Sequence, residues 1–288
     1  MRRLFLVLAA ATAATACITV LQLGGEAHAE DGVPLVFDIH PGGEPALVFV
    51  HGWACDRTFW SAQVQPFVKS HTVVLMDLAG HGQSGDEREV WSIEAFSGDV
   101  QAVIEELDLE QVIVIGHSMG GYVALDVARR MPDTVLAVVG VDTLHDADRE
   151  FSEDELDAAL ASFEEDWNGT MGSMLPNMLS PETDESVALW ILGRVDAAHQ
   201  GPALATLRGF PQLDLPALFE NADVPIRCIN SVPGEAPANQ PTETLANQRY
   251  ADFGVVYMER VGHYPMLERP DVFNVKLAEV LADILYGP

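Results

Sequence analysis

The stretch from Gly116 to Gly121 combines a serine with glycines at a spacing suited to nucleophilic chemistry. Gly116, Ser118 and Gly120 form the pattern Gly-x-Ser-x-Gly between an apolar run at 112–115 and an amphipathic run at 119–131. A strand that passes into a helix within three residues strains the turn residue, and flanking glycines permit this because they lack a Cβ. Ser118 would then stand at a helix N-terminus, where backbone N–H groups stabilise negative charge. The stretch predicts a serine that attacks a carbonyl carbon, although a glycine-rich corner with a serine of no function has the same letters.

A serine hydroxyl becomes a strong nucleophile only when a base accepts its proton. Of the nine histidines, His263 fits this role best because it follows the apolar run 255–258 and precedes the last helical segment. A loop at the carboxyl end of a parallel strand reaches the same sheet edge as Ser118. We expect His117 to point away from the nucleophile and His81, in a glycine loop, to be structural.

The base in turn needs a group that holds its imidazole in the required tautomer and stabilises its cation.

The tetrahedral intermediate of acyl transfer carries an oxyanion that needs two N–H donors. The backbone of Met119, at the start of the expected helix, supplies one. Trp53 follows the apolar run 46–50 in His51-Gly52-Trp53 and supplies the other, unless His51-Gly52 is a plain strand-ending turn. Because no histidine, cysteine and carboxylate cluster has ligand spacing, we expect no metal and no other cofactor.

Apolar runs alternate with helical patterns over most of the chain, which predicts an α/β fold with a mostly parallel central sheet and helices on both faces. The alternation stops between 145 and 220, where helical stretches at 153–166, 183–195 and 203–207 follow one another without strands. We therefore assign 30–144 and 221–288 to the core and 145–220 to a helical cap. The cap's larger apolar residues either roof a substrate pocket or fill the cap's own core; they include Trp167, Met171, Met174, Met178 and Trp190.

The first 29 residues have the features of a secretory signal peptide. Arg2 and Arg3 precede an apolar run that extends to about Leu23, and Ala27-His-Ala29 is a small-x-small cleavage site. We expect an exported protein, periplasmic or extracellular, that begins at Glu30 and does not bind membranes after cleavage. An uncleaved anchor, a lipoprotein modified at Cys17 and a twin-arginine signal are the alternatives.

The net charge of −29 comes from 44 acidic and 15 basic residues, and only Lys69 and Lys276 are lysines. Such a surface repels nucleic acid and anionic membranes, so neither is an expected partner. It resembles the acidic surfaces of proteins from saline environments. Nothing in the sequence brings Cys55 and Cys228 together as a disulfide, and nothing specifies the oligomeric state.

Taken together, the motifs resemble those of the α/β-hydrolase superfamily and cover nearly all of the sequence after residue 30. The matching segments are His51-Gly52-Trp53, Asp77-x-x-Gly80-x-Gly82-x-Ser84, the 116–121 stretch, Gly262-His263 and the Pro-Met-Leu-Glu-Arg-Pro tail at 265–270. The resemblance implies the fold and a Ser–His machinery, but no substrate, because the family includes esterases, lactonases, perhydrolases, C–C bond hydrolases and non-enzymes. Its dehalogenases carry Asp where Ser118 stands.

One departure from the family pattern concerns the acid. The usual Gly-x-x-Asp turn reads Asn230-Ser-Val-Pro-Gly-Glu-Ala236 here, without an aspartate. The family's other solution places the acid at the end of the preceding core strand, so we favour Asp142 and keep Glu235 as the alternative. We expect a serine hydrolase that acts on a small or medium uncharged carboxylic ester. A lactonase, a cofactor-free perhydrolase and a non-catalytic binding protein are the alternatives.

Overall fold

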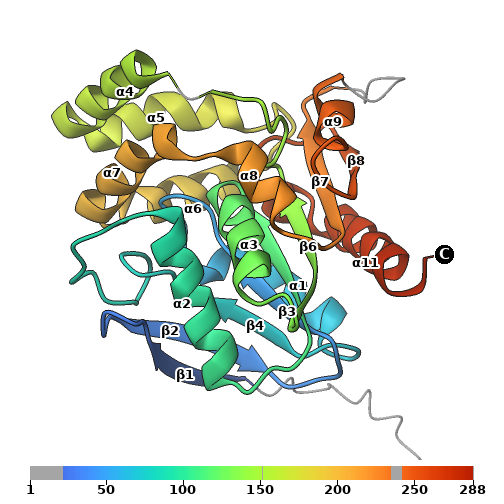
Figure 1. Ribbon diagram of the computed structural model, residues 1–288. Helices are drawn as coiled ribbons and strands as arrows, with labels where there is room; N and C mark the ends of the chain where they lie inside the picture. Colours follow the sequence, from blue (N-terminus) through green and yellow to red (C-terminus); the bar gives the residue numbers. More distant parts are fainter. Residues whose placement is uncertain (1–21, 151, 235–241, 288) are drawn as a thin grey trace, which may run out of the picture.

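The computed structural model describes residues 22–150, 152–234 and 242–287, and its centre is one eight-stranded sheet (Figure 1). The strands lie in the order β1-β2-β4-β3-β5-β6-β7-β8. β2 pairs antiparallel with both β1 and β4, and all the other neighbours are parallel. The strands are β1 (Leu23–His28), β2 (Pro34–His40), β3 (Ala46–Val50), β4 (Val73–Met76), β5 (Val112–His117), β6 (Val135–Val141), β7 (Ile226–Val232) and β8 (Phe253–Glu259).

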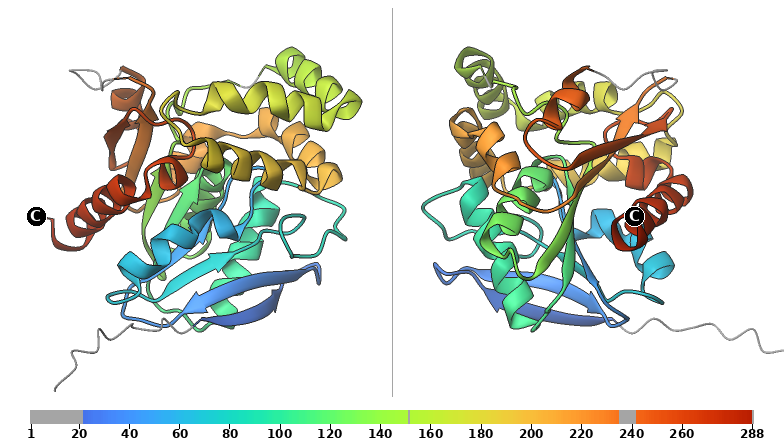
Figure 2. Two further views of the ribbon diagram at one scale, coloured as in Figure 1. Left: turned by 180° about the vertical axis from the view of Figure 1, so that it is seen from behind. Right: turned by 45° about the vertical axis from the view of Figure 1, so that its right-hand side comes forward.

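Helices cover both faces of the sheet, which confirms the α/β fold predicted from the sequence (Figure 2). On one face α3 contacts both α2 and α8, and on the other face α1 contacts α11. None of the described helices is both long and apolar enough to cross a membrane. The core helices are α1 (Ser61–Phe67), preceded by a 3-10 turn at Arg57–Trp60, α2 (Ile93–Glu106), α3 (Met119–Arg130), α9 (Thr242–Asn247), α10 (Pro265–Glu268) and α11 (Pro270–Tyr286).

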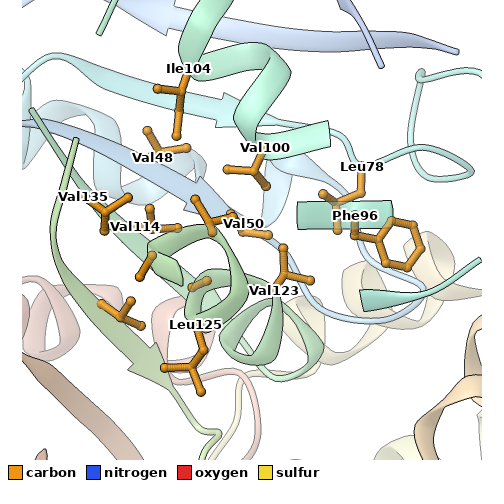
Figure 3. Packing of buried hydrophobic residues seen from close by; sticks show 14 of the residues in the cluster. Val48, Val50, Leu78, Phe96, Val100, Ile104, Val114, Val123, Leu125 and Val135 are labelled. Carbon is orange, nitrogen blue, oxygen red and sulfur yellow. The ribbon is translucent and has the colours of Figure 1, made fainter. Parts of the chain in front are cut away.

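The central strands are buried on both sides, which explains why their sequences are continuous apolar runs rather than alternating ones. Ser92 caps the N-terminus of α2, where its hydroxyl accepts from the Ala95 N–H, and α2 turns its apolar face to the sheet. Figure 3 shows this packing: the strands contribute Val48, Val50, Val114 and Val135, and the helices above them contribute Phe96, Val100, Ile104, Val123 and Leu125.

The strand β1 did not follow from the sequence. It pairs with β2 along its whole length, from Leu23 opposite Ile39 to His28 opposite Pro34. Ala27 on this edge strand and Ala29 just after it, which resemble a cleavage site, are both buried. The sheet therefore begins within the segment 1–29 that the sequence interpretation assigned to the leader, and the core boundary at residue 30 lies inside the fold. Residues 1–21 are outside the described part of the chain.

Between β6 and β7, the described residues 145–150 are a loop, and residues 152–220 contain helices and no strand. α4 to α7 lie together over one end of the sheet, whereas α8 packs on α3 (Figure 1). The helix at 167–178 was not predicted because Gly169, Gly172 and Pro176 are poor helix formers. The helices of the insertion are α4 (Glu153–Glu165), α5 (Trp167–Met178), α6 (Glu185–Asp196), α7 (Gln200–Gly209), a 3-10 turn at Phe210–Gln212, and α8 (Leu215–Glu220).

Candidate active site

Ser118 lies in a sharp turn between β5 and α3, with φ 51° and ψ −119°. This is the strained conformation that the glycine pattern predicts. The two flanking glycines are needed because the backbone passes too close for a side chain. A Cβ on Gly116 would lie 2.1 Å from the carbonyl oxygen of Gly120, and a Cβ on Gly120 would lie 2.6 Å from that of Val50. The turn thus depends on glycine at both positions.

The structure brings His263 and Asp142 together. The imidazole Nδ1 lies 2.6 Å from Oδ2 of Asp142, and Oδ1 of the same carboxylate accepts from the Ser231 N–H at 2.9 Å. Burial acts to raise the pKa of Asp142, but the hydrogen bond and charge of His263 outweigh it, so the pKa lies below its usual 3.8. An ionised Asp142 keeps the proton on Nδ1 and leaves Nε2 able to accept one. The alternative acid, Glu235, lies outside the described residues.

The loop that carries His263 is fixed by its own backbone. The His263 N–H donates to the Met178 carbonyl at the end of α5, at 2.6 Å, and the His263 carbonyl accepts from Nε2 of His117 at 2.7 Å. The carboxylate of Glu268 accepts from the N–H groups of Gly262 and Tyr264 on either side. No role for His117 or Glu268 followed from the sequence, because these bonds join segments far apart in the chain.

The loop after β3 is oriented by His51. Nε2 of His51 accepts from the Leu78 N–H at 3.1 Å, so the proton is on Nδ1, which donates to the carbonyl of Gly52 at 2.8 Å. Burial lowers the pKa of His51 to about 4, which keeps it neutral as this pairing requires. Because a trans peptide is planar, the N–H of Trp53 points away from the Gly52 carbonyl that His51 holds.

The loop before Trp53 and the start of α3 at Met119 both lie next to the serine. A Cβ on Gly52 would lie only 3.1 Å from Cβ of Ser118, so the loop that leads to Trp53 passes directly beside it. Met119 is the first residue of α3, where the backbone N–H has no partner within the helix. The indole of Trp53 donates to the Ala203 carbonyl of α7 at 2.8 Å, which connects this loop to the insertion.

Ser118 and His263 line one small, enclosed cavity of about 50 Å³. Its roof comes from residues of α5 and α6. Larger hollows at the surface contain neither residue. The other residues that line the cavity are Trp53, Cys55, His117, Met171, Met174, Leu175, Met178, Val195 and Tyr264.

Cys55 and Cys228 are free, buried thiols. Burial raises the pKa of each, so both stay protonated at neutral pH. Within the described ranges, no three histidine, cysteine or carboxylate side chains are grouped as metal ligands would be.

Comparison with known proteins identifies the family. The model of the alpha/beta hydrolase family matches residues 47–275. The chain belongs to the α/β-hydrolase family. The match covers most of the sheet, the insertion and the candidate site residues Trp53, Ser118, Met119, Asp142 and His263.

Two curated relatives and one solved structure indicate the range of this family. The chain is 27% identical to the karrikin insensitive 2 receptor CA of Petunia hybrida over 80% of this chain and 89% of that protein. It is 36% identical to the bifunctional esterase/perhydrolase DCH of Acinetobacter calcoaceticus over 40% and 43% of the two chains. A thermophilic esterase from Thermogutta terrifontis has the same fold, with a TM-score of 0.78 at 23% identity, over 91% of this chain and 99% of that one.

The alignments with the first curated relatives span less than a third of those proteins' length. The family and the hydrolase fold therefore follow from the comparisons, while the reaction has to be argued from the site.

Proposed function

We propose that this α/β hydrolase cleaves carboxylic esters through a serine nucleophile. The contact of His263 with Asp142, 2.6 Å between Nδ1 and Oδ2, carries the proposal, because it pairs a base with an orienting acid at the cavity that also contains Ser118. In the first step Oγ of Ser118 bonds to the ester carbonyl carbon and its proton passes to Nε2 of His263. The N–H groups of Trp53 and Met119 stabilise the resulting oxyanion.

Collapse of this intermediate breaks the bond to the alcohol oxygen, which leaves with the proton from His263. A water molecule then gives a proton to His263 and bonds to the acyl carbon. When the bond to Oγ breaks, the carboxylic acid leaves and Ser118 regains its proton. Asp142 stabilises the His263 cation in both halves of the cycle.

The lining of the cavity supports an uncharged substrate at the reacting bond. No lysine, arginine, aspartate or glutamate lines it among the described residues. A carboxylate or ammonium placed beside the ester bond would lose its hydration without gaining a partner. No metal or organic cofactor takes part in the proposed steps.

Hydrolysis of p-nitrophenyl acetate, followed by release of p-nitrophenol, tests the proposal. A serine-reactive phosphonate should abolish the activity and add its mass to the peptide that contains Ser118. Ser118→Ala should fold normally and lose several orders of magnitude in kcat. Unchanged activity in Ser118→Ala would rule the assignment out.

Perhydrolysis is the second candidate, because one relative is a bifunctional esterase/perhydrolase. Hydrogen peroxide would then replace water in the attack on the acyl-enzyme and release a peracid. Acetate with peroxide, assayed for peracetic acid, separates this reaction from simple hydrolysis, and a lactone panel tests ring opening. A protein that binds these compounds without turning them over would instead act as a receptor, as the name of the Petunia relative suggests for that protein.

A further inference from the structure

The size of the catalytic cavity sets a limit on the acyl group, if Ser118 is the nucleophile as proposed above. The cavity has a volume of about 50 Å³ and is largely enclosed. By comparison, an apolar cavity of about 150 Å³ in another protein holds benzene, which has six carbon atoms. A third of that volume accommodates about two or three carbon atoms. This is the size of an acetyl or propionyl group whose carbonyl oxygen faces the oxyanion donors.

The wall of the cavity is mostly apolar and has no charged side chain to bind a functionalised acyl chain. The Trp53 indole donates to the Ala203 carbonyl, and the Cys55 thiol donates to the Trp53 carbonyl. Burial raises the pKa of Cys55 and of Tyr264, so both side chains are neutral. A charged acyl chain would therefore lose water and gain no ionic partner.

The roof of the cavity is one face of α5, where Met171, Met174, Leu175 and Met178 recur at helical spacing. Met171 and Leu175 are 2% and 4% exposed, so neither can turn into solvent without opening the packed cap.

α5 is also tied to the base. Its last carbonyl groups include that of Met178, which accepts from the His263 N–H at 2.6 Å. At its other end the indole of Trp167 donates to the Val195 carbonyl of α6 at 3.3 Å. An outward shift of α5 to admit a long acyl chain would strain the bond that positions His263. These two hydrogen bonds therefore hold α5, and with it the roof of the cavity, in place over Ser118.

We propose that the protein is a short-acyl ester hydrolase, specific for acetyl and propionyl esters, and that Leu175 sets the upper limit of acyl length. One methylene in excess of a tight pocket costs about 10- to 200-fold in discrimination. Hexanoyl esters should therefore be cleaved at least about tenfold less efficiently than acetyl esters.

The test is kcat/KM for p-nitrophenyl acetate, propionate, butyrate, hexanoate and octanoate. Leu175→Ala removes three carbon atoms from the roof and should move the optimum to butyrate or hexanoate. Leu160→Ala is the matched control, because Leu160 is a cap leucine of similar burial, 5% exposed, that does not line the cavity. Leu160→Ala should keep the order of kcat/KM that the native protein shows among the five esters.

Leu175→Val is a milder variant for the case in which Leu175→Ala does not fold. It should raise kcat/KM for the butyrate ester relative to that for the acetate ester. A native protein that cleaves hexanoate or octanoate as efficiently as acetate overturns the inference. So does a folded Leu175 variant with an unchanged acyl order. If none of the esters is hydrolysed, the proposed esterase function itself fails, which is a different result from a wrong chain length.

Discussion

The imidazole of His117 donates a hydrogen bond from Nε2 to the backbone carbonyl of His263, at 2.7 Å. His117 is the residue before Ser118, so the turn that carries the proposed nucleophile also holds the loop that carries its base. Burial, with a smaller contribution from the nearby His263, lowers the pKa of His117 to about 3, and the neutral ring remains a donor across the physiological range. The segment His117-Ser118 therefore carries the proposed nucleophile and also holds the loop of its base in place.

This bond predicts the effect of His117→Phe, which keeps an aromatic ring and removes the donor. A lost hydrogen bond of about 1.4 kcal/mol corresponds to a tenfold change in rate, so we expect kcat to fall by about tenfold with KM nearly unchanged. The control is His40→Phe, at another buried histidine, on β2 away from the cavity. A larger loss in His40→Phe than in His117→Phe would refute the positioning role.

The identity of the acid can be tested in the same assay. Asp142→Asn should preserve the fold and lower kcat by up to about four orders of magnitude, because an amide holds the imidazole in the wrong tautomer. Glu235→Gln should leave kcat nearly unchanged. If kcat instead falls strongly in Glu235→Gln and is nearly unchanged in Asp142→Asn, the acid lies in the turn after β7.

Stability should fall on mild acidification because three histidines are buried in the neutral form. Burial lowers the pKa of His51 to about 4 and of His81 and His117 to about 3. Below the unfolded value of about 6.5 the unfolded chain takes up protons that the native state does not, so stability is lost as the pH falls from 7 toward 4. At pH 5 each histidine contributes a loss of about 2 kcal/mol.

Thermal unfolding at pH 7 and pH 5 measures this loss. Most carboxylates titrate below this window, so the change reports mainly on histidine. If the three histidines contribute alike, His81→Leu should reduce the loss of stability between pH 7 and pH 5 by about a third. An unfolding temperature that is the same at pH 5 and pH 7 would show that these rings are accessible to protons in the native state.

The strand β1 leads to a prediction about the N-terminus. A chain that begins at Glu30 loses β1, one of the two strand partners of β2, and uncovers Leu35 and Phe37, which are buried in the intact sheet. We expect it to unfold at a lower temperature and to associate through the exposed edge, unlike a chain that begins at Gln22. Light scattering and thermal unfolding of the two chains measure this. If a leader is removed on export, its cut should lie before Leu23, and a mature chain that starts at Glu30 would contradict this.

The sequence predicted best those features that depend on local pattern and on the rule that parallel strands end at one edge. The place of His263 followed from the end of a strand, and α3 from its apolar spacing and the glycine turn. Asp142 was favoured over Glu235 because of the resemblance to the α/β-hydrolase family. β1 was missed because Ala27-His-Ala29 has the same small residues as a cleavage site. α5 was missed because packing against α4 and α6 outweighs the low helix propensity of its glycines and Pro176.

The bonds of His51 and His117 were beyond prediction for another reason. His51 orients the Gly52 carbonyl only because the Leu78 N–H, which follows a different strand, occupies its other nitrogen. Such a tautomer is fixed by a contact between distant segments, and no spacing in the chain encodes it.

The acidic surface leads to the last prediction, which concerns salt. With 44 acidic and 15 basic residues the folded chain repels itself, and unfolding relieves part of this repulsion by separating the charges. The screening length falls from about 30 Å at 0.01 M salt to about 3 Å at 1 M, so molar sodium chloride should raise the unfolding temperature substantially. Sucrose at matched osmolality serves as the control, since it strengthens burial without screening charge. A protein that is stabilised equally by sucrose and by salt, or by neither, would show that self-repulsion does not limit its stability.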